Sequence, residues 1–201
     1  MLTQNDIKLI EFFLKHTQDE FSIREISRQI KTDYKLVHNS IKRLINKKII
    51  AKKRHGKTEL CAVNLKGAVD YLIQVENIKS RRFLERNTGI KLIIREIKEK
   101  IKTSYYTFIL FGSYAKEKQH KRSDLDLLFI VPGEEFIKEI GAAINSVSAI
   151  KPIKIHSLVV TSKDFKEMLA AKDEINIAKE TLNNHIIFYG AEAYYSLLEV
   201  L

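Results

Sequence analysis

Two carboxylates stand two residues apart where an apolar segment of the sequence begins. Asp124 and Asp126 open the segment 123–131, whose later residues are almost all apolar and predict a buried strand. Because strand side chains alternate between the two faces, residues at i and i+2 share one face. Two acids at the start of a buried strand are costly to leave unpaired, and a divalent cation is their natural partner. The spacing therefore predicts a Mg²⁺ site, and two solvated aspartates at an exposed strand start are the alternative.

A Gly-Ser pair precedes these acids and ends another expected strand. The apolar run 105–111 is followed directly by Gly112 and Ser113, where the chain should turn into a helix. Gly112 lets the backbone approach a phosphate closely, and Ser113 adds a hydroxyl beside the free N–H groups of the helix start. A triphosphate on this pair, bridged to the two aspartates by Mg²⁺, would allow metal-assisted in-line displacement. We therefore expect Gly112 and Ser113 to bind a nucleotide.

The order Phe111-Gly112-Ser113, ten further residues and Asp124-Leu125-Asp126 resembles the signature of the DNA polymerase β-like nucleotidyltransferase superfamily, at the spacing of its minimal prokaryotic branch. The resemblance covers about residues 88–195. It implies a small mixed sheet with helices packed on one side. It also implies catalytic and metal-binding roles for the two aspartates, ATP as substrate or ligand, and transfer of AMP to a protein or small acceptor. Members of this branch often act as the antitoxin partner of a toxin, so the resemblance implies a toxin-like protein partner.

One departure from the signature concerns a third carboxylate, which active relatives usually place on a later strand. No acid occurs between Glu139 and Asp164. Lys154 or Ser157 stands where the acid is expected, and a Lys there would compete with a metal by charge. His156 is either a ligand or base, or a structural residue of the sheet. Catalysis is therefore left open, with transfer of AMP as the leading prediction.

Three short helices and a basic hairpin are predicted over the first 64 residues. Thr3 is placed to cap a first helix, Ser22 and Glu25 have the spacing of a capping box, and Asp33 is placed to cap a third helix. The strands 49–53 and 58–63 then form a hairpin that turns at Gly56.

This order of elements resembles the winged helix-turn-helix family over about residues 3–64. The resemblance implies that the third helix enters the major groove of double-stranded DNA and that the hairpin grips the backbone or minor groove. Asn39 is the best candidate for a base contact, because its amide can both donate to and accept from adenine. The alternative is a domain for protein contacts or dimerisation. The DNA-binding residues that the resemblance implies are Lys35, His38, Asn39 and Lys42 on the helix and Lys52, Lys53, Arg54 and Lys57 on the hairpin.

The distribution of charge supports a polyanionic partner for the N-terminal part. The chain has 35 Lys and Arg against 25 Asp and Glu, a net charge of +10. Residues 1–90 hold 19 of these basic residues and 10 of the acids, so nearly all of the excess lies in the first half. Such a surface binds phosphates with release of counterions.

Composition and the single cysteine indicate the class of protein. A content of 45% hydrophobic and 30% charged residues is typical of a compact globular chain. Cys61 cannot form an internal disulfide, which favours a reducing, cytoplasmic location. The longest apolar run is far shorter than a membrane span, and the N-terminus does not have the pattern of a signal peptide, so no membrane partner is expected.

The predicted fold class is α+β, with an N-terminal winged helix-turn-helix joined by a helix to a small mixed-sheet nucleotidyltransferase domain. The expected domains are residues 1–65 for DNA binding, a linker helix over 66–87 and the nucleotidyltransferase-like domain over 88–201. Apolar residues left over on the linker helix also suit a dimer seam, so a homodimer is expected. The leading prediction is a DNA-binding regulator that binds ATP and Mg²⁺. The alternatives are a transcriptional regulator whose second domain is a catalytically dead sensor or dimer module, and an enzyme that acts on RNA.

Overall fold

The computed structural model of the chain describes residues 1–56, 58–120, 122–171 and 176–198. The chain divides into two compact units, Met1–Val75 and Glu76–Leu201. The boundary between them falls inside one helix, α4 (Val69–Arg86). None of the helices in the described part of the chain is both long and apolar enough to cross a bilayer.

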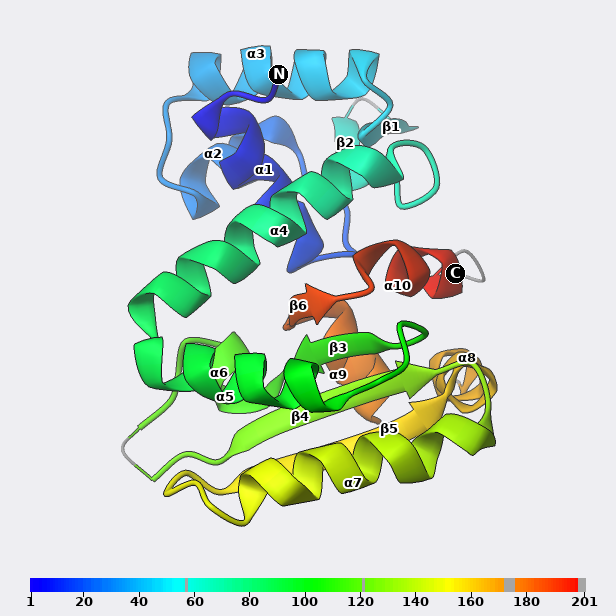
Figure 1. Cartoon of the computed structure of the whole chain (residues 1–201). Helices are drawn as coiled ribbons and strands as arrows, with labels where there is room; N and C mark the ends of the chain where they lie inside the picture. Colours follow the sequence, from blue (N-terminus) through cyan, green and yellow to red (C-terminus); the bar gives the residue numbers. More distant parts are fainter. Residues whose placement is uncertain (57, 121, 172–175, 199–201) are drawn as a thin grey trace. The chain divides into compact units, whose positions relative to one another are not determined.

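The N-terminal unit contains three helices followed by an antiparallel hairpin, in the order that the sequence predicts (Figure 1). Gly56 lies in the turn of the hairpin with φ +59°, a conformation that glycine adopts without strain. The elements are α1 (Gln4–Leu14), α2 (Ile23–Gln29), α3 (Tyr34–Asn46), β1 (Ile50–His55) and β2 (Thr58–Val63).

The three helices begin at the caps that the sequence predicts. The Thr3 hydroxyl accepts a hydrogen bond from the Asp6 amide, and the Asp6 carboxylate accepts one from the Thr3 amide. Ser22 and Glu25 form the same reciprocal box at the start of α2. The Asp33 carboxylate accepts from two amides in the first turn of α3. Each cap satisfies amides that have no partner within the helix, which fixes where the helix begins.

The C-terminal unit is built on a mixed four-stranded sheet in the order β5-β4-β3-β6. β3 pairs antiparallel with β4 and β6, whereas β4 and β5 are parallel. The strands are β3 (Thr107–Leu110), β4 (Leu125–Val131), β5 (Ile155–Thr161) and β6 (Ile186–Tyr189). The helices are α5 (Thr88–Lys100), α6 (Gly112–Ala115), α7 (Ile137–Ser148) after a short 3-10 turn (Glu134–Phe136), α8 (Ser162–Ala170), α9 (Ile177–Asn183) and α10 (Ala191–Leu197).

Both faces of the central strands are buried, which corrects the expectation that helices pack on one side only. Phe108 and Phe129 stack at 4.2 Å between ring centroids and form one core with apolar residues of α5 and α7. Ile109 and Leu128 point to the opposite face by strand alternation and are also fully buried. α8 contacts β4 and β5, and α10 contacts β3. Figure 1 shows α5 and α7 in front of the sheet and α9 behind it.

Candidate functional site

The turn at Gly112 and Ser113 and the carboxylate of Asp126 lie side by side at one end of the sheet. The Phe111 amide donates to the Asp126 carbonyl at 3.0 Å, which ties the end of β3 to the start of β4. Gly112 has φ +68°, and a Cβ on it would lie 2.1 Å from Asp126 Oδ2. Because Gly112 has no Cβ, the carboxylate of Asp126 can lie beside it. Ser113 follows it in α6, a helix of a single turn.

The two aspartates face the same partner on the neighbouring strand. Asp124 lies just before β4 and Asp126 lies within it. His156 pairs with Asp126 in the parallel register of β4 and β5. Its Nδ1 atom is 3.6 Å from Asp124 Oδ2 and 3.6 Å from Asp126 Oδ1. Both acids thus lie within reach of one side chain.

Basic side chains occupy the place where a third carboxylate is expected. Besides His156, Lys154 reaches the site, with its Nζ atom 3.8 Å from Asp124 Oδ2. Ser157 pairs with Leu127 and points to the other face by strand alternation, so it does not stand in the site. The sequence could not decide between these residues because the register of β5 on β4 comes from tertiary packing.

An ion pair that sequence reasoning missed lies close to the carboxylates. Glu180 on α9 binds Lys116, the C-cap residue of α6, at 2.6 Å between Oε1 and Nζ. Burial raises the pKa of Asp126 above its ordinary value, His156 lowers it, and the negative charges of Asp124 and Glu180 raise it further. Because 64 residues separate Lys116 from Glu180, no local pattern in the sequence predicts this pair.

The donor atoms fit a metal that is shared with phosphates. Within the described residues, no three His, Cys, Asp or Glu side chains are grouped so that they could hold a metal ion. Asp124 and Asp126 are part-exposed, at 34% and 26%, and offer oxygen ligands only. Mg²⁺ is commonly held by one or two carboxylates together with substrate phosphates and waters. The pair therefore fits Mg²⁺ that arrives with a nucleotide rather than a metal that the protein holds alone.

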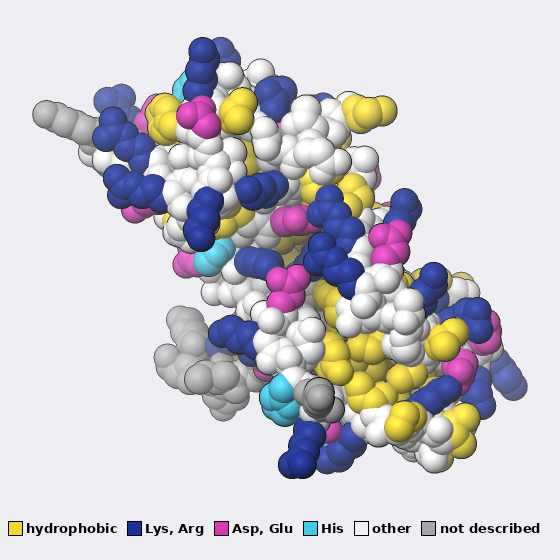
Figure 2. Space-filling model, turned by 90° about the vertical axis from the view of Figure 1, so that its left-hand side faces the viewer, with side chains coloured by type: hydrophobic (Ala, Val, Ile, Leu, Met, Phe, Trp, Pro, Cys, Tyr) yellow, Lys and Arg dark blue, Asp and Glu magenta, His cyan; other side chains and the backbone are white. Residues whose placement is uncertain are grey.

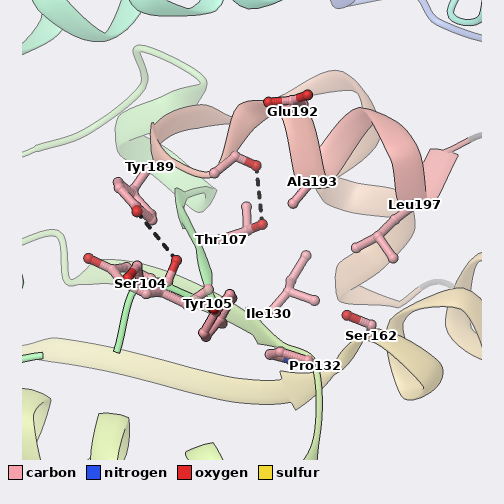
Figure 3. Close-up of a pocket in the computed structure, with 12 residues that line it drawn as sticks. Ser104, Tyr105, Thr107, Ile130, Pro132, Ser162, Tyr189, Glu192, Ala193 and Leu197 are labelled. Carbon is pink, nitrogen blue, oxygen red and sulfur yellow. Dashed lines mark hydrogen bonds between the residues drawn. The ribbon is translucent and has the colours of Figure 1, made fainter. Parts of the chain in front are cut away.

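A cavity of about 370 Å³ lies at the opposite end of the sheet (Figure 3). Thr107 and Ile130 form part of its lining, at the ends of β3 and β4 away from Gly112 and Asp126. The Tyr189 hydroxyl donates to the Ser104 carbonyl at 3.3 Å, and the Thr107 hydroxyl donates to the Gly190 carbonyl at 3.2 Å. Among the described residues that line this cavity there is no Lys, Arg or His, so none of these side chains brings a positive charge to it.

The predicted DNA-binding side chains of α3 lie on one exposed face. Lys35, His38, Asn39 and Lys42 are all exposed, while Val37, Ile41 and Leu44 are buried on the opposite side of the helix. The ring of Tyr34 stacks on His38 with 6.1 Å between centroids. On the face that Figure 2 shows, Lys and Arg side chains project from many places on the N-terminal unit.

The cations of the hairpin are partly neutralised by acidic neighbours. Lys52 binds Glu59 at 2.5 Å, and Lys53 binds Glu20 at 2.6 Å. The Arg54 Nε atom donates to the carbonyl of Gly56 at 3.2 Å. Lys57, which was also predicted to contact DNA, lies outside the described residues. The hairpin therefore carries less uncompensated charge than its sequence suggests.

Comparison with known proteins gives one functional match. Residues 90–183 match the family model of the nucleotidyltransferase domain, and this range includes both the Gly-Ser turn and the two aspartates. Residues 1–64 match a family model described as HVO_A0114. Among solved structures, the chain is similar to a "toxin-antitoxin with AMP-PNP", at 16% identity and a TM-score of 0.36, over 54% of this chain and 79% of that chain. No curated protein matches the chain.

Proposed function

We propose that the C-terminal unit binds ATP with Mg²⁺ and transfers AMP to a hydroxyl group of a protein or small acceptor. The observation that carries this proposal is the close approach of Asp126 to Gly112, where a Cβ would lie 2.1 Å from the carboxylate. Because of this approach, the proposed metal ligands lie beside the turn that is proposed to receive phosphates. The nucleotidyltransferase match over residues 90–183 supports the same activity.

In this proposal each group has one task. The backbone at Gly112 and the hydroxyl of Ser113 hold phosphate oxygens of ATP. Asp124 and Asp126 would hold Mg²⁺, which when bound would stabilise the negative charge that develops on the phosphate oxygens. The acceptor oxygen forms a bond to the α-phosphorus as the bond to pyrophosphate breaks. His156 Nδ1, 3.6 Å from both carboxylates, is the group proposed to take the acceptor proton.

A second candidate function follows from the side chains that replace the third acid. Lys154 Nζ lies 3.8 Å from Asp124 Oδ2, so a cation of the protein already compensates one of the two carboxylates. A second Mg²⁺ ion, which would activate the acceptor, would lack the third carboxylate as a ligand and would be repelled by the charge of Lys154. The unit would then bind a nucleotide without transferring it, as a sensor within a transcriptional regulator.

Calorimetric titration of ATP, with and without Mg²⁺, tests the site without knowledge of the acceptor. We expect binding that depends on Mg²⁺ and is lost in Asp126→Asn, because the amide removes one charged ligand. Glu167→Gln, at an exposed carboxylate of α8, is the matched control and should bind as the wild type does. Equal binding by Asp126→Asn would remove Asp126 from the metal site.

Transfer is then separated from binding by incubation with ATP labelled on the α-phosphate. Label that becomes attached to a protein or small acceptor supports the transferase. Mg²⁺-dependent binding without any labelled acceptor, in a lysate of the source cell, supports the sensor. An antitoxin-like role with a toxin as acceptor, a homodimeric state and a cytoplasmic location are further proposals that rest on the sequence alone.

We further propose that the N-terminal unit binds double-stranded DNA through α3 and the hairpin. The exposed face of α3 carries two Lys, a His and an Asn, which suit phosphates and base edges. In the double variant Lys52→Ala, Lys53→Ala, we expect weaker duplex binding. The salt slope should fall by about one unit for each phosphate that the variant no longer neutralises.

The control for this experiment is the double variant Lys163→Ala, Lys166→Ala, which removes two exposed lysines from the C-terminal unit. Its salt slope should equal that of the wild type. A slope that is unchanged in the hairpin variant would exclude the hairpin from the DNA interface. A slope reduced equally in both variants would indicate binding through net charge rather than through this surface.

A further inference from the structure

A fully buried ion cluster lies at the start of the C-terminal unit, away from the carboxylates of the candidate site. The side chain of Glu76, in α4, has 0% exposure, and that of His185 has 1%. Glu76 Oε1 accepts from His185 Nε2 at 2.9 Å and from the Tyr195 hydroxyl at 3.3 Å. Lys79 Nζ lies 3.3 Å from Glu76 Oε2. These contacts satisfy a carboxylate that would otherwise be very costly to bury.

The same histidine holds the end of α9. His185 Nδ1 donates to the carbonyl of Thr181, and the Tyr194 hydroxyl donates to that carbonyl at 3.0 Å. Carbonyls in the last turn of a helix have no partner within the helix, so such donors fix where and how it ends. Both ring nitrogens of His185 face oxygen atoms, one of Thr181 and one of Glu76. The contact with Glu76 therefore keeps the His185 ring in position for Thr181.

α9 in turn reaches the candidate nucleotide site. Glu180, next to Thr181, binds Lys116 Nζ at 2.6 Å, and the Lys116 amide donates to the Gly112 carbonyl at 3.1 Å. α9 has only seven residues, too few to be stable without tertiary contacts. The placement of Glu180, and through it of the turn at Gly112, thus depends on what holds the end of α9.

We propose that Glu76 and His185 are positioning residues for the nucleotide site, acting through the Thr181 carbonyl on α9 and the ion pair between Glu180 and Lys116. This inference rests on the proposed binding of ATP and Mg²⁺. A stabilising role alone is a poor explanation of the cluster, because a buried ion pair is often no more stable than apolar side chains of similar volume. The contact between Glu76 and His185 instead fixes the orientation of the His185 ring, and with it the direction of the hydrogen bond to the Thr181 carbonyl.

The test compares Glu76→Gln with Ile144→Ala, a core variant in α7 that loses stability but has no place in the chain of contacts. Ile144 is buried at 1% exposure in the core formed with α5. We expect Glu76→Gln to weaken the affinity for ATP and Mg²⁺ by about twofold to thirtyfold, the range for residues that act through such networks. Ile144→Ala should bind as the wild type does at a temperature where both variants are folded.

A double variant tests the route. Lys116→Met removes the ion pair with Glu180, so adding Glu76→Gln to it should weaken binding little further. Additive effects of the two substitutions, equal losses in Glu76→Gln and Ile144→Ala, or unchanged affinity in Glu76→Gln would each overturn the proposal.

Hydrogen exchange measured without nucleotide separates a failure of this inference from a failure of the proposed function. Glu76→Gln should speed exchange of amides in α9 and α6 by about tenfold or more, with α7 unchanged. If the wild type binds no ATP, the proposed function fails, and this exchange pattern alone would support the positioning of α9 and α6. Exchange that is unchanged in α9 and α6 would overturn the inference whether or not ATP binds.

Discussion

The substitution Gly112→Ala tests whether the carboxylate of Asp126 needs the space beside Gly112 in order to bind Mg²⁺ with the nucleotide. A Cβ at this position would lie 2.1 Å from Asp126 Oδ2 and 3.0 Å from its Cγ. The nearest atoms belong to the end of a side chain, so the carboxylate can move aside. To reach an ordinary contact of about 3.4 Å, the oxygen must shift by more than about 1 Å. Such a shift is large for a metal ligand, which must be held within about 0.5 Å.

The magnitude of the two effects follows from this geometry. The left-handed conformation at Gly112, with φ +68°, costs an alanine about 1–2 kcal/mol. The free energy of unfolding should therefore fall by only that amount. Affinity for ATP and Mg²⁺ should fall by about tenfold to a hundredfold, the range for substitutions that disturb the orientation of a metal ligand.

Gly190→Ala is the matched control because its clash is of the opposite kind. Gly190 has φ +75°, and a Cβ there would lie 2.5 Å from the Tyr106 carbonyl oxygen and 2.9 Å from Thr107 Cα. Backbone atoms cannot move aside as a carboxylate can, so this variant should lose more stability than Gly112→Ala, by about 1–3 kcal/mol. Its site at Gly112 and Asp126 remains intact, so its affinity for the nucleotide should be unchanged.

Urea unfolding followed by circular dichroism gives the stability of both variants, and calorimetric titration gives their affinity for ATP with Mg²⁺. We expect Gly112→Ala to lose the more affinity and Gly190→Ala to lose the more stability. Wild-type affinity in Gly112→Ala would refute this expectation, because the alanine would then have been accommodated without displacing Asp126.

Two further predictions concern stability. Burial alone would raise the pKa of Glu76, but Lys79 and His185 lower this pKa from 4.5 to about 2. The ionised Glu76 carboxylate therefore stabilises the folded protein above pH 4.5, and this stabilisation is lost as the pH falls towards 2. Urea titrations over this range should show wild-type stability falling by about 3 kcal/mol more than that of Glu76→Gln, and parallel curves would contradict the pairing. Asp6→Ala removes the hydrogen bond that the Thr3 amide donates to the Asp6 carboxylate and the 2.8 Å hydrogen bond from Arg43, while the residue-6 amide still bonds to the Thr3 hydroxyl, so unfolding of the N-terminal unit should become easier by about 1–3 kcal/mol. A decrease below about 0.5 kcal/mol, measured by hydrogen exchange in α1, would show that water replaces these hydrogen bonds.

The sequence predicts well what is decided by neighbouring residues. Thr3, Ser22 and Asp33 each start a helix as expected, because a cap bonds to amides two or three residues away. The mixed α+β architecture is also predicted, because alternating helices and apolar strands leave few ways to bury their faces. Gly112 is expected to approach a phosphate, and the structure adds a local reason for glycine in the neighbouring carboxylate.

The sequence predicts poorly what is decided by pairing of distant segments. His156 faces Asp124 and Asp126 only because β5 pairs with β4 in one register, and a shift by one residue would turn it to the other face. Glu76 and His185 are 109 residues apart, and nothing near either residue announces the pair. Long-range polar contacts of this kind depend on the completed packing, so no local pattern in the sequence predicts them.

The order of strands in the sheet decides when the C-terminal unit can be completed during synthesis. β3 is the first of its four strands to be made, and its neighbour β6 is the last. At about 5–20 residues per second, the ribosome needs on the order of 4 to 16 seconds to pass from Phe108 to its partner Tyr189. Throughout that interval one hydrogen-bonding edge of β3 has no strand beside it, and such edges promote aggregation. A ribosome that stalls between β5 and β6 therefore leaves a three-stranded product in which β3 is an exposed edge strand.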